Sequence, residues 1–488
     1  MSLATICGVT VLRSLVISMI GVFLSRHLSQ RIDTGYSKRS FTLFLLILSP
    51  FLVPELIVGY AWSLISLKLV HYPFFIELIY ASLVLLKVVP VGIVCFHFSA
   101  PPVISPEADF IQKSMRATSA SISGMKSRWS FLLWKTMQRT IPVWTLLFLL
   151  SFQEFEMASL IYRDSWTVWI FDAQAGGVPI TQTISFLTGP LIIELLIISG
   201  VLFLFSRLPH PPRLNPPSNV KKQSLIASVL SWSYLLIAFF AVVVIPFSLT
   251  GWGGVLSLGS LFQNQLQLAG ILSECAWGLL YGITAGIAAW GLASFFFSKN
   301  QSRILKVTGF LCCLPGLCGS LTLALIMATL FLAEYSRWLY DTPLALFIAL
   351  VFYLFPRAVF LKLIFIAQWQ NDSLFLAQLL SQSKNHHQAI KGGRLRWAVY
   401  GNMQYWAVVI LAFWSYWDVI ISSILAPNHT MSSAVRLYGL MHYGQNSILS
   451  AMTFLSLFIP VFVSILLLPV VKYLWITVSD RFNMNQTV

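Results

Sequence analysis

The stretch SILSAMTFLSLFIPVFVSILLLPVV, residues 447–471, contains 25 residues and no charged side chain. A helix needs about 20 mostly apolar residues to cross the hydrocarbon core of a bilayer. Because lipid offers the backbone no hydrogen-bond partner, a run that crosses it must form a helix. The stretch therefore predicts a transmembrane helix, and similar runs recur along the chain.

The composition extends this prediction to the whole chain. Hydrophobic residues make up 57% of the 488 positions and charged residues 10%. The length alone would suggest about three soluble domains of roughly 150 residues. Soluble domains carry about 25% charged residues, so this chain has too few charges to coat their surfaces. We expect an all-α fold, a polytopic membrane helix bundle.

Eleven segments are long and apolar enough to be spans, which predicts 11 transmembrane helices. They are Leu3–Leu24, Phe41–Ile65, Phe74–Phe98, Ile141–Ile161, Phe186–Ser206, Leu225–Leu249, Ala269–Phe297, Ile304–Leu332, Leu344–Ala367, Tyr405–Leu425 and Ser447–Val471.

The basic residues indicate the orientation of these spans. In and beside one set of alternate loops lie 23 lysines and arginines; the other set holds four, which are Lys68, Arg163, Arg337 and Arg436. Cytoplasmic loops carry the excess, so we expect the N terminus outside and the C terminus in the cytoplasm. The basic residues of the cytoplasmic loops then account for most of the net charge of +15. Because no basic groove with interleaved aromatics is evident, we expect lipid and no nucleic acid as a partner.

Four pairs of matching features indicate an internal duplication. They are Ser151–Glu154 with Ser415–Asp418, Val168–Phe171 with Val435–Tyr438, Pro90 with Pro356, and Gly124–Trp129 with Gly392–Trp397. The second member of each pair lies 264 to 268 residues after the first. Because the paired loops lie on the same side, the halves are parallel repeats. We expect a first half of five spans (1–207), a Pro-rich cytoplasmic linker (208–223) and a second half of six spans (224–488).

Two long cytoplasmic loops, Ser99–Thr140 and Gln368–Gln404, carry the pattern Gly-x-basic-x-Arg-Trp. Its candidate docking residues are Gly124, Arg128, Trp129, Gly392, Arg396 and Trp397. One interpretation is a basic amphipathic helix that lies on anionic lipid. The other is a pair of docking sites for cytosolic subunits. The duplication favours docking, because lipid contact does not require one pattern at equivalent positions.

Ionisable residues inside spans are costly and point to function. Glu154 and Asp418 occupy equivalent positions in the fourth and tenth spans, so both are candidates for a transport pathway at the seam between the halves. The alternative is structural pairing inside the bundle, for example of Lys87 with an acid. Other intramembrane ionisable residues are Arg13, Glu194 and Glu274.

These loops and the spans after them resemble the permease subunits of binding-protein-dependent ABC importers, in particular the fused two-repeat permeases of iron(III) importers. Gly124 and Gly392 match the glycine of the family's cytoplasmic loop. Further similar segments are Phe148–Glu154, Phe413–Asp418, Leu425–Pro427, Val435–Gln445 and Leu314–Gly316. The family's Glu-Ala-Ala is replaced by Thr118-Ser119-Ala120 and by His386-His387-Gln388, so neither loop keeps the family's acid.

The resemblance implies a bacterial inner-membrane permease. Its partners would be two cytosolic ATP-binding subunits and an extracytoplasmic solute-binding protein, and its solute iron(III), thiamine, sulfate, phosphonate or a polyamine. The chain has no Gly-x-x-x-x-Gly-Lys-Ser/Thr phosphate loop and no metal-ligand pattern. We therefore expect a non-catalytic subunit without cofactor, metal or catalytic residues.

Two other functions stay open. An ion-coupled secondary transporter would use Glu154 and Asp418 for proton or sodium coupling, but leaves the matched loops unexplained. A membrane-embedded enzyme would need a cluster of catalytic groups in a large external loop. The external segments Tyr162–Ser185 and Ala426–Asn446 are short and carry few charges, so the enzyme is the weaker alternative.

Overall fold

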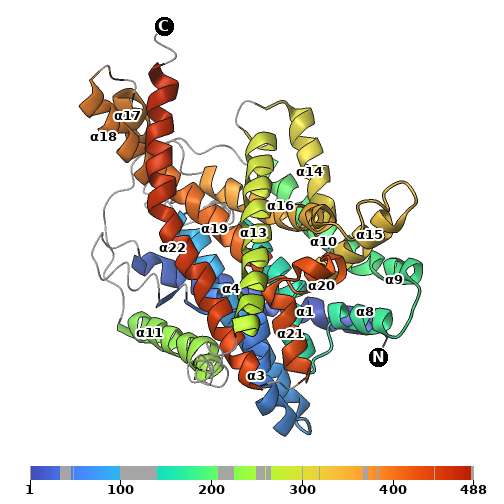
Figure 1. Cartoon of the computed structure of the whole chain (residues 1–488). Helices are drawn as coiled ribbons and strands as arrows, with labels where there is room; N and C mark the ends of the chain where they lie inside the picture. Colours follow the sequence, from blue (N-terminus) through green and yellow to red (C-terminus); the bar gives the residue numbers. More distant parts are fainter. Residues whose placement is uncertain are drawn as a thin grey trace. The chain divides into compact units, whose positions relative to one another are not determined.

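The computed structural model describes residues 2–32, 46–47, 49–98, 140–206, 225–248, 259, 265–298, 301–317, 319–366, 372–381, 383, 385–443 and 446–484. Within these ranges the chain forms helices and no strand (Figure 1). The prediction of an all-α fold is confirmed for this part. The Pro-rich linker and the first long loop, with Gly124, Arg128 and Trp129, lie outside it.

Six helices are long and apolar enough to cross a membrane. They are Leu3–Ser29, Pro73–Phe96, Thr140–Leu160, Gln267–Phe296, Pro343–Lys362 and Ile448–Thr477. Each coincides with a segment that the sequence predicts to be a span. Two shorter apolar helices, Thr188–Gly200 and Trp232–Val244, lie within two further predicted segments. The chain is therefore an all-α protein with several helices suited to a membrane.

The predicted span Ile304–Leu332 is not straight. Helices α14 (Arg303–Leu317) and α15 (Ser320–Leu332) meet at an angle of 101°. Gly319 lies between them with φ 82° and ψ 162°, a conformation that is essentially restricted to glycine. Pro315, in the last turn of α14, cannot donate a backbone hydrogen bond. These two residues explain why the apolar run bends.

The described chain divides into two compact units. Unit 1 comprises Met1–Glu55, Ser63–Trp169 and Gly189–Ile245; unit 2 comprises Leu56–Trp62, Ile170–Thr188 and Pro246–Val488. The segment 225–245 thus belongs to unit 1, whereas the duplication assigns it to the second half. The boundary between the repeated halves stays a prediction.

Small residues allow two helices of unit 1 to pack closely. Its helices are α1 (Leu3–Ile32), α4 (Pro73–Phe98), α7 (Glu156–Leu160), α10 (Thr188–Ser206), α11 (Leu225–Phe239) and the π-helical η1 (Phe240–Val244), with α3 (Glu55–Lys68) and α8 (Trp166–Ala175) shared between the units. Helix α1 packs along α4, where the Ser25 hydroxyl donates to the Val89 carbonyl at 3.0 Å. A Cβ added at Gly92 would lie 2.3 Å from the Ser25 oxygen, so this contact requires glycine.

Unit 2 is built around the long helix α13 (Gln265–Phe296), which packs against α16 (Pro343–Ile366) and α19 (Asn402–Tyr416) (Figure 1). The unit also contains α9 (Ile180–Phe186), α17 (Asp372–Ser381), α18 (His386–Arg396), η3 (Trp397–Gly401), α20 (Ile420–Leu425), η4 (Asn428–Thr430), α21 (Ser433–Tyr443) and α22 (Asn446–Met484).

A ladder of glycines at four-residue spacing lets α19 approach α13. A Cβ would meet the Tyr416 ring at 3.0 Å if added at Gly278, and the Ala412 carbonyl oxygen at 2.7 Å if added at Gly282. At Gly286 it would lie 3.2 Å from the Ala412 nitrogen. Small residues at such spacing allow the backbones of membrane helices to touch.

Candidate functional sites: two buried carboxylates and a basic helical hairpin

Glu154 lies at a break between two helices. The preceding helix ends at Phe152 and α7 begins two residues after Glu154. The Glu154 carboxylate accepts hydrogen bonds from the backbone N–H groups of Met157 at 2.5 Å and Ala158 at 3.2 Å. N–H groups in the first turn have no partner within their own helix. The buried side chain therefore caps α7.

Asp418 has the same local geometry in unit 2. Helix α19 ends at Tyr416, and α20 begins at Ile420. The Asp418 carboxylate accepts a hydrogen bond of 2.9 Å from the backbone N–H of Ile421, again three residues ahead. Only 5% of the Asp418 side chain is exposed. Each acid lies one residue before the N-cap position and accepts from an N–H group in the first turn of the short helix that follows, where the helix dipole favours a negative charge.

A chain of polar groups extends from Glu154 to the loop after α7. The Tyr80 hydroxyl donates to Glu154 at 2.6 Å, and the Arg13 guanidinium lies 4.8 Å from the centroid of the Tyr80 ring. Arg13 Nε lies 2.5 Å from one Glu77 oxygen, and Arg163 Nη2 lies 2.7 Å from the other. Arg13 thus has an acidic partner, as the structural interpretation of intramembrane charges requires.

The turn after α7 holds a non-glycine residue in a left-handed conformation. Tyr162 has φ 60°, and the Arg163 N–H donates to the Ala158 carbonyl at 2.8 Å. This is the pattern that ends many helices, and glycine usually occupies the left-handed position. The Tyr162 ring is exposed, whereas Arg163 is tied to Glu77. The ion pair holds a turn that tyrosine disfavours.

Asp418 has a basic neighbour on α16. Arg357 is 9% exposed, and its charge acts on Asp418. Its Nη1 donates to the Tyr353 carbonyl at 2.9 Å, and its Cζ lies 3.8 Å from the Tyr353 ring centroid and 5.7 Å from that of Trp414. Stacking on aromatic faces stabilises a desolvated guanidinium. The Asp418 site therefore combines a helix break, a carboxylate and an aromatic-lined cation.

Lys87 is bound by backbone rather than by the acid that the sequence suggested. Its ammonium group donates to the carbonyls of Pro50 at 3.0 Å and Phe51 at 3.3 Å, and to that of Val53. These carbonyls lie where one helix ends before Pro54, and carbonyls at a helix end need a partner. The charge of Glu55 also acts on Lys87. Lys87 therefore stabilises a broken segment within the predicted second span.

The other intramembrane acids also have neighbours. Gln153 Nε2 donates to Glu194 at 3.0 Å, and Arg436 Nε lies 4.0 Å from Glu274. Pairing of this kind favours a structural role for these residues. Among the described residues, no group of three or more His, Cys, Asp or Glu side chains could hold a metal ion. Whether Glu154, in unit 1, and Asp418, in unit 2, line one pathway stays a prediction.

The second of the two long loops contains a helical hairpin formed by α17 and α18. The Asn385 side chain accepts a hydrogen bond of 3.1 Å from the His387 N–H and so caps α18. Gly392 lies where α18 meets the end of α17: an added Cβ would lie 2.3 Å from the Ser381 nitrogen and 2.6 Å from the Leu380 carbonyl carbon. The glycine of Gly-x-basic-x-Arg-Trp is therefore required for close helix packing.

The rest of the second motif divides between interior and surface. Trp397 is only 5% exposed, and its ring centroid lies 6.5 Å from that of Tyr405. Arg396 is half-buried, whereas Lys391 and Arg394 are exposed. Lys391 and Arg394 therefore form an exposed basic face that a docking contact could use, while Gly392 and Trp397 shape the interior of the hairpin. Because exposed basic residues tolerate either lipid or an acidic protein surface, both interpretations of the loop remain open.

Sequence reasoning missed several structural features. The ladder Gly278, Gly282 and Gly286 could have been found from its small-x-x-x-small spacing. The Glu77 bridge between Arg13 and Arg163 joins residues far apart in the sequence, and no local sequence pattern predicts it.

Comparison with protein-family models, curated proteins and solved structures finds no match to the chain.

Proposed function

We propose that this chain is the membrane permease of an ATP-driven importer and that the α17–α18 hairpin docks a cytosolic ATP-binding subunit. The observation that carries the proposal is the hairpin itself. It lies in the chain between the apolar helices α16 and α19, has a packed interior at Gly392 and Trp397, and exposes Lys391 and Arg394. A rigid structure with a charged face suits transmission of force better than a flexible connection does.

The duplication supports a pair of such subunits. Each acid, Glu154 and Asp418, accepts a backbone hydrogen bond from the residue three positions ahead at the start of a short helix. Equal local structure at a separation of 264 residues favours two parallel repeats. In this proposal the loop with Gly124, Arg128 and Trp129 docks one ATP-binding subunit, and the loop with Gly392, Arg396 and Trp397 docks the other.

The finer features of the proposal follow from the resemblance and the charge distribution. The chain has 11 spans in a bacterial inner membrane, its N terminus lies outside, and a solute-binding protein delivers the solute. The solute is iron(III) or another small ion or molecule carried by importers of this type. The chain provides the path and performs no chemical step, because ATP is hydrolysed on the partner chains.

Charge reversal on the hairpin tests the proposal. The chain carries an affinity tag in its native cell, and the purified complex is analysed for an ATPase present in two copies. We expect the double variant Lys391→Glu and Arg394→Glu to lose one or both ATPase copies and ATP-dependent uptake. Arg337→Glu is the matched control, because Arg337 is exposed in a loop predicted on the opposite side of the membrane. Wild-type protein that purifies without an ATPase and transports without ATP refutes the proposal.

An ion-coupled secondary transporter is the second candidate, and the buried Glu154 carboxylate, which accepts a hydrogen bond from Tyr80, favours it. Intramembrane acids serve in the proton relays of transporters. In this case uptake collapses when the proton or sodium gradient is dissipated, even with ATP present. Glu154→Gln keeps an oxygen that can cap α7 but carries no ionisable proton. Full gradient-driven uptake by this variant and by Asp418→Asn excludes the two acids as coupling groups.

A further inference from the structure

Helix α22 is longer than a bilayer requires. It contains 39 residues, which corresponds to about 58 Å at about 1.5 Å per residue. The hydrocarbon core is about 30 Å thick. The C-terminal turns of α22, around Trp475, therefore continue past the span that residues 447–471 can form, on the side that the proposed topology assigns to the cytoplasm.

These turns contact the hairpin through aromatic rings. The Trp475 ring centroid lies 5.9 Å from that of Trp397, with an interplanar angle of 68°, and 6.1 Å from that of Tyr400. Edge-to-face and tilted pairs at such distances are favourable beyond the area that they bury. Trp397 ends the Gly-x-basic-x-Arg-Trp motif, so Trp475 contacts the motif at its buried residue.

Two further contacts join this part of the chain to α22. A Cβ added at Gly393 would lie 3.5 Å from Ile476 Cγ2, an ordinary packing distance. The Tyr405 hydroxyl donates to the Ser464 carbonyl about three turns earlier on α22. The segment from Gly393 to Tyr405 is thus attached to α22 at two levels, one at each end of the segment.

We infer that the C-terminal turns of α22 hold the docking hairpin in place and that Trp475 is a positioning residue for coupling between the hairpin and the last span. This inference rests on the proposed function. When a docked subunit displaces the basic face formed by Lys391 and Arg394, the contact between Trp397 and Trp475 transmits the movement to α22. The alternative is a hairpin that is held by lipid or by its own helix pair and that moves independently of α22.

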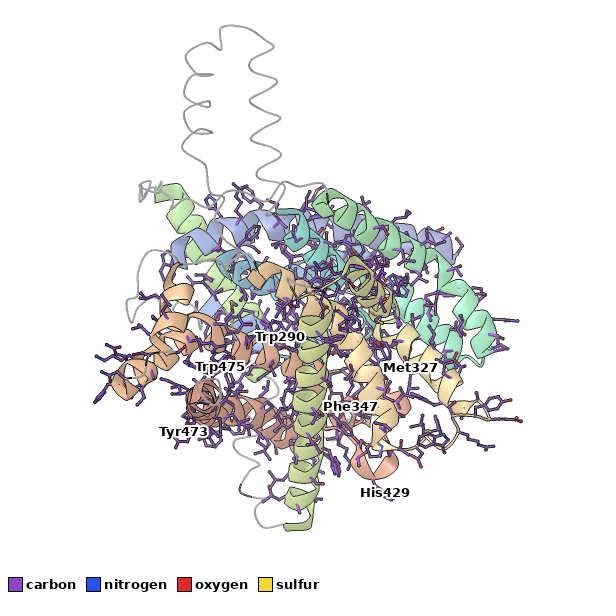
Figure 2. The ribbon with its side chains drawn as sticks, turned by 90° about the horizontal axis from the view of Figure 1, so that it is seen from above. Trp290, Met327, Phe347, His429, Tyr473 and Trp475 are labelled. Atoms are coloured by element: carbon purple, nitrogen blue, oxygen red, sulfur yellow. The ribbon has the colours of Figure 1, made fainter. Side chains whose placement is uncertain are left out.

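Trp475→Ala removes the ring from both aromatic pairs, and Tyr473→Ala is the matched control. Tyr473 is 70% exposed and lies two residues away, about 200° around the helix; Figure 2 shows both side chains on α22. Trp475→Phe keeps an aromatic ring and serves as the rescue variant. All three are made in the full chain and compared with the wild type, first as the purified chain and then in the complex.

The first measurement is amide hydrogen exchange of residues 386–401. Loss of two aromatic pairs is expected to accelerate this exchange about tenfold in Trp475→Ala, with little change in Tyr473→Ala and partial protection in Trp475→Phe. Unchanged exchange in Trp475→Ala overturns the inference, because the ring then does not hold the hairpin. This measurement requires no ATPase and is valid even if the proposed function fails.

The second measurement is solute-stimulated ATP hydrolysis by the complex. We expect Trp475→Ala to retain both ATPase copies but to lose most of the stimulation by solute and binding protein, and Trp475→Phe to recover part of it. Faster exchange together with unchanged stimulation overturns the positioning role. Absence of any ATPase from the wild-type complex refutes the proposed function instead, so the two failures are distinguishable.

Discussion

The approach of α13 to α19 depends on glycine, and this dependence allows a graded test. In Gly282→Ala the added Cβ would lie 2.7 Å from the Ala412 carbonyl oxygen, whereas ordinary contacts begin at 3.4 Å. The obstacle is backbone, so the two helices must separate by about 0.7 Å or tilt. Overpacking of a well-packed interior costs about 1–3 kcal/mol.

Two other glycines of α13 provide the matched controls. In Gly286→Ala the nearest atom would lie 3.2 Å from the added Cβ, and at Gly291 nothing lies within 4 Å. Replacement of glycine by alanine also favours a helix by about 1 kcal/mol. Because all three variants share this gain, the difference between Gly282→Ala and Gly291→Ala isolates the packing cost. We expect stability to rise in the order Gly282→Ala, Gly286→Ala, Gly291→Ala.

The buried cysteines Cys275 and Cys313 permit a direct assay. A thiol-reactive fluorogenic dye labels them when heating in detergent opens unit 2, and the midpoint of the labelling curve reports stability. We expect Gly282→Ala to unfold at a lower temperature than Gly291→Ala, by a difference equivalent to about 1–3 kcal/mol. Equal midpoints, or a higher midpoint for Gly282→Ala, refute the close approach of α13 and α19.

Three further substitutions test other contacts. Lys87 and Tyr162 lie in unit 1, so their effect is followed by thermal labelling of its buried cysteines, Cys7 and Cys95, whereas Gly392 is tested by proteolysis. Lys87→Met leaves the carbonyls around Val53 without their donor and is expected to cost about 1–3 kcal/mol; a midpoint equal to that of the wild type contradicts the assigned role of Lys87. Tyr162→Gly relieves the left-handed backbone at φ 60° and should stabilise the chain by about 1 kcal/mol, so a lower midpoint argues that the Tyr162 ring contributes more than its strain costs. Gly392→Val places a branched side chain 2.3 Å from the Ser381 nitrogen. It should open the α17–α18 hairpin and expose residues 372–401 to limited proteolysis, and resistance equal to that of the wild type shows that the helices do not meet there.

Long apolar runs predicted most of the observed membrane-type helices, because a run without charges can satisfy its backbone only as a helix. Prolines such as Pro315 predict some interruptions of these runs, but the breaks beside the two acids escaped prediction. The segments Ile141–Ile161 and Tyr405–Leu425 look continuous, yet both break beside an acid, at Glu154 and Asp418. A hydropathy average over about 19 residues does not detect a helix break of three residues.

The sequence also predicted the candidate docking site only in part. The pattern Gly-x-basic-x-Arg-Trp pointed to the hairpin, but sequence alone treated Gly392, Arg396 and Trp397 as one docking surface. The structure buries Gly392 and Trp397 and exposes Lys391 and Arg394. Which side of a helix faces its neighbour depends on how that neighbour packs, and this information is not local.

The sequence by itself determined that the chain is helical and apolar enough for a membrane, because composition and run length fix how the backbone can be satisfied in lipid. It also located the two acids and the basic motif. Only the tertiary structure decided what each of them contacts. The Glu77 bridge, the carbonyl partners of Lys87 and the contact of Trp475 with Trp397 join residues distant in sequence, and such pairings are set by three-dimensional packing rather than by local chemistry.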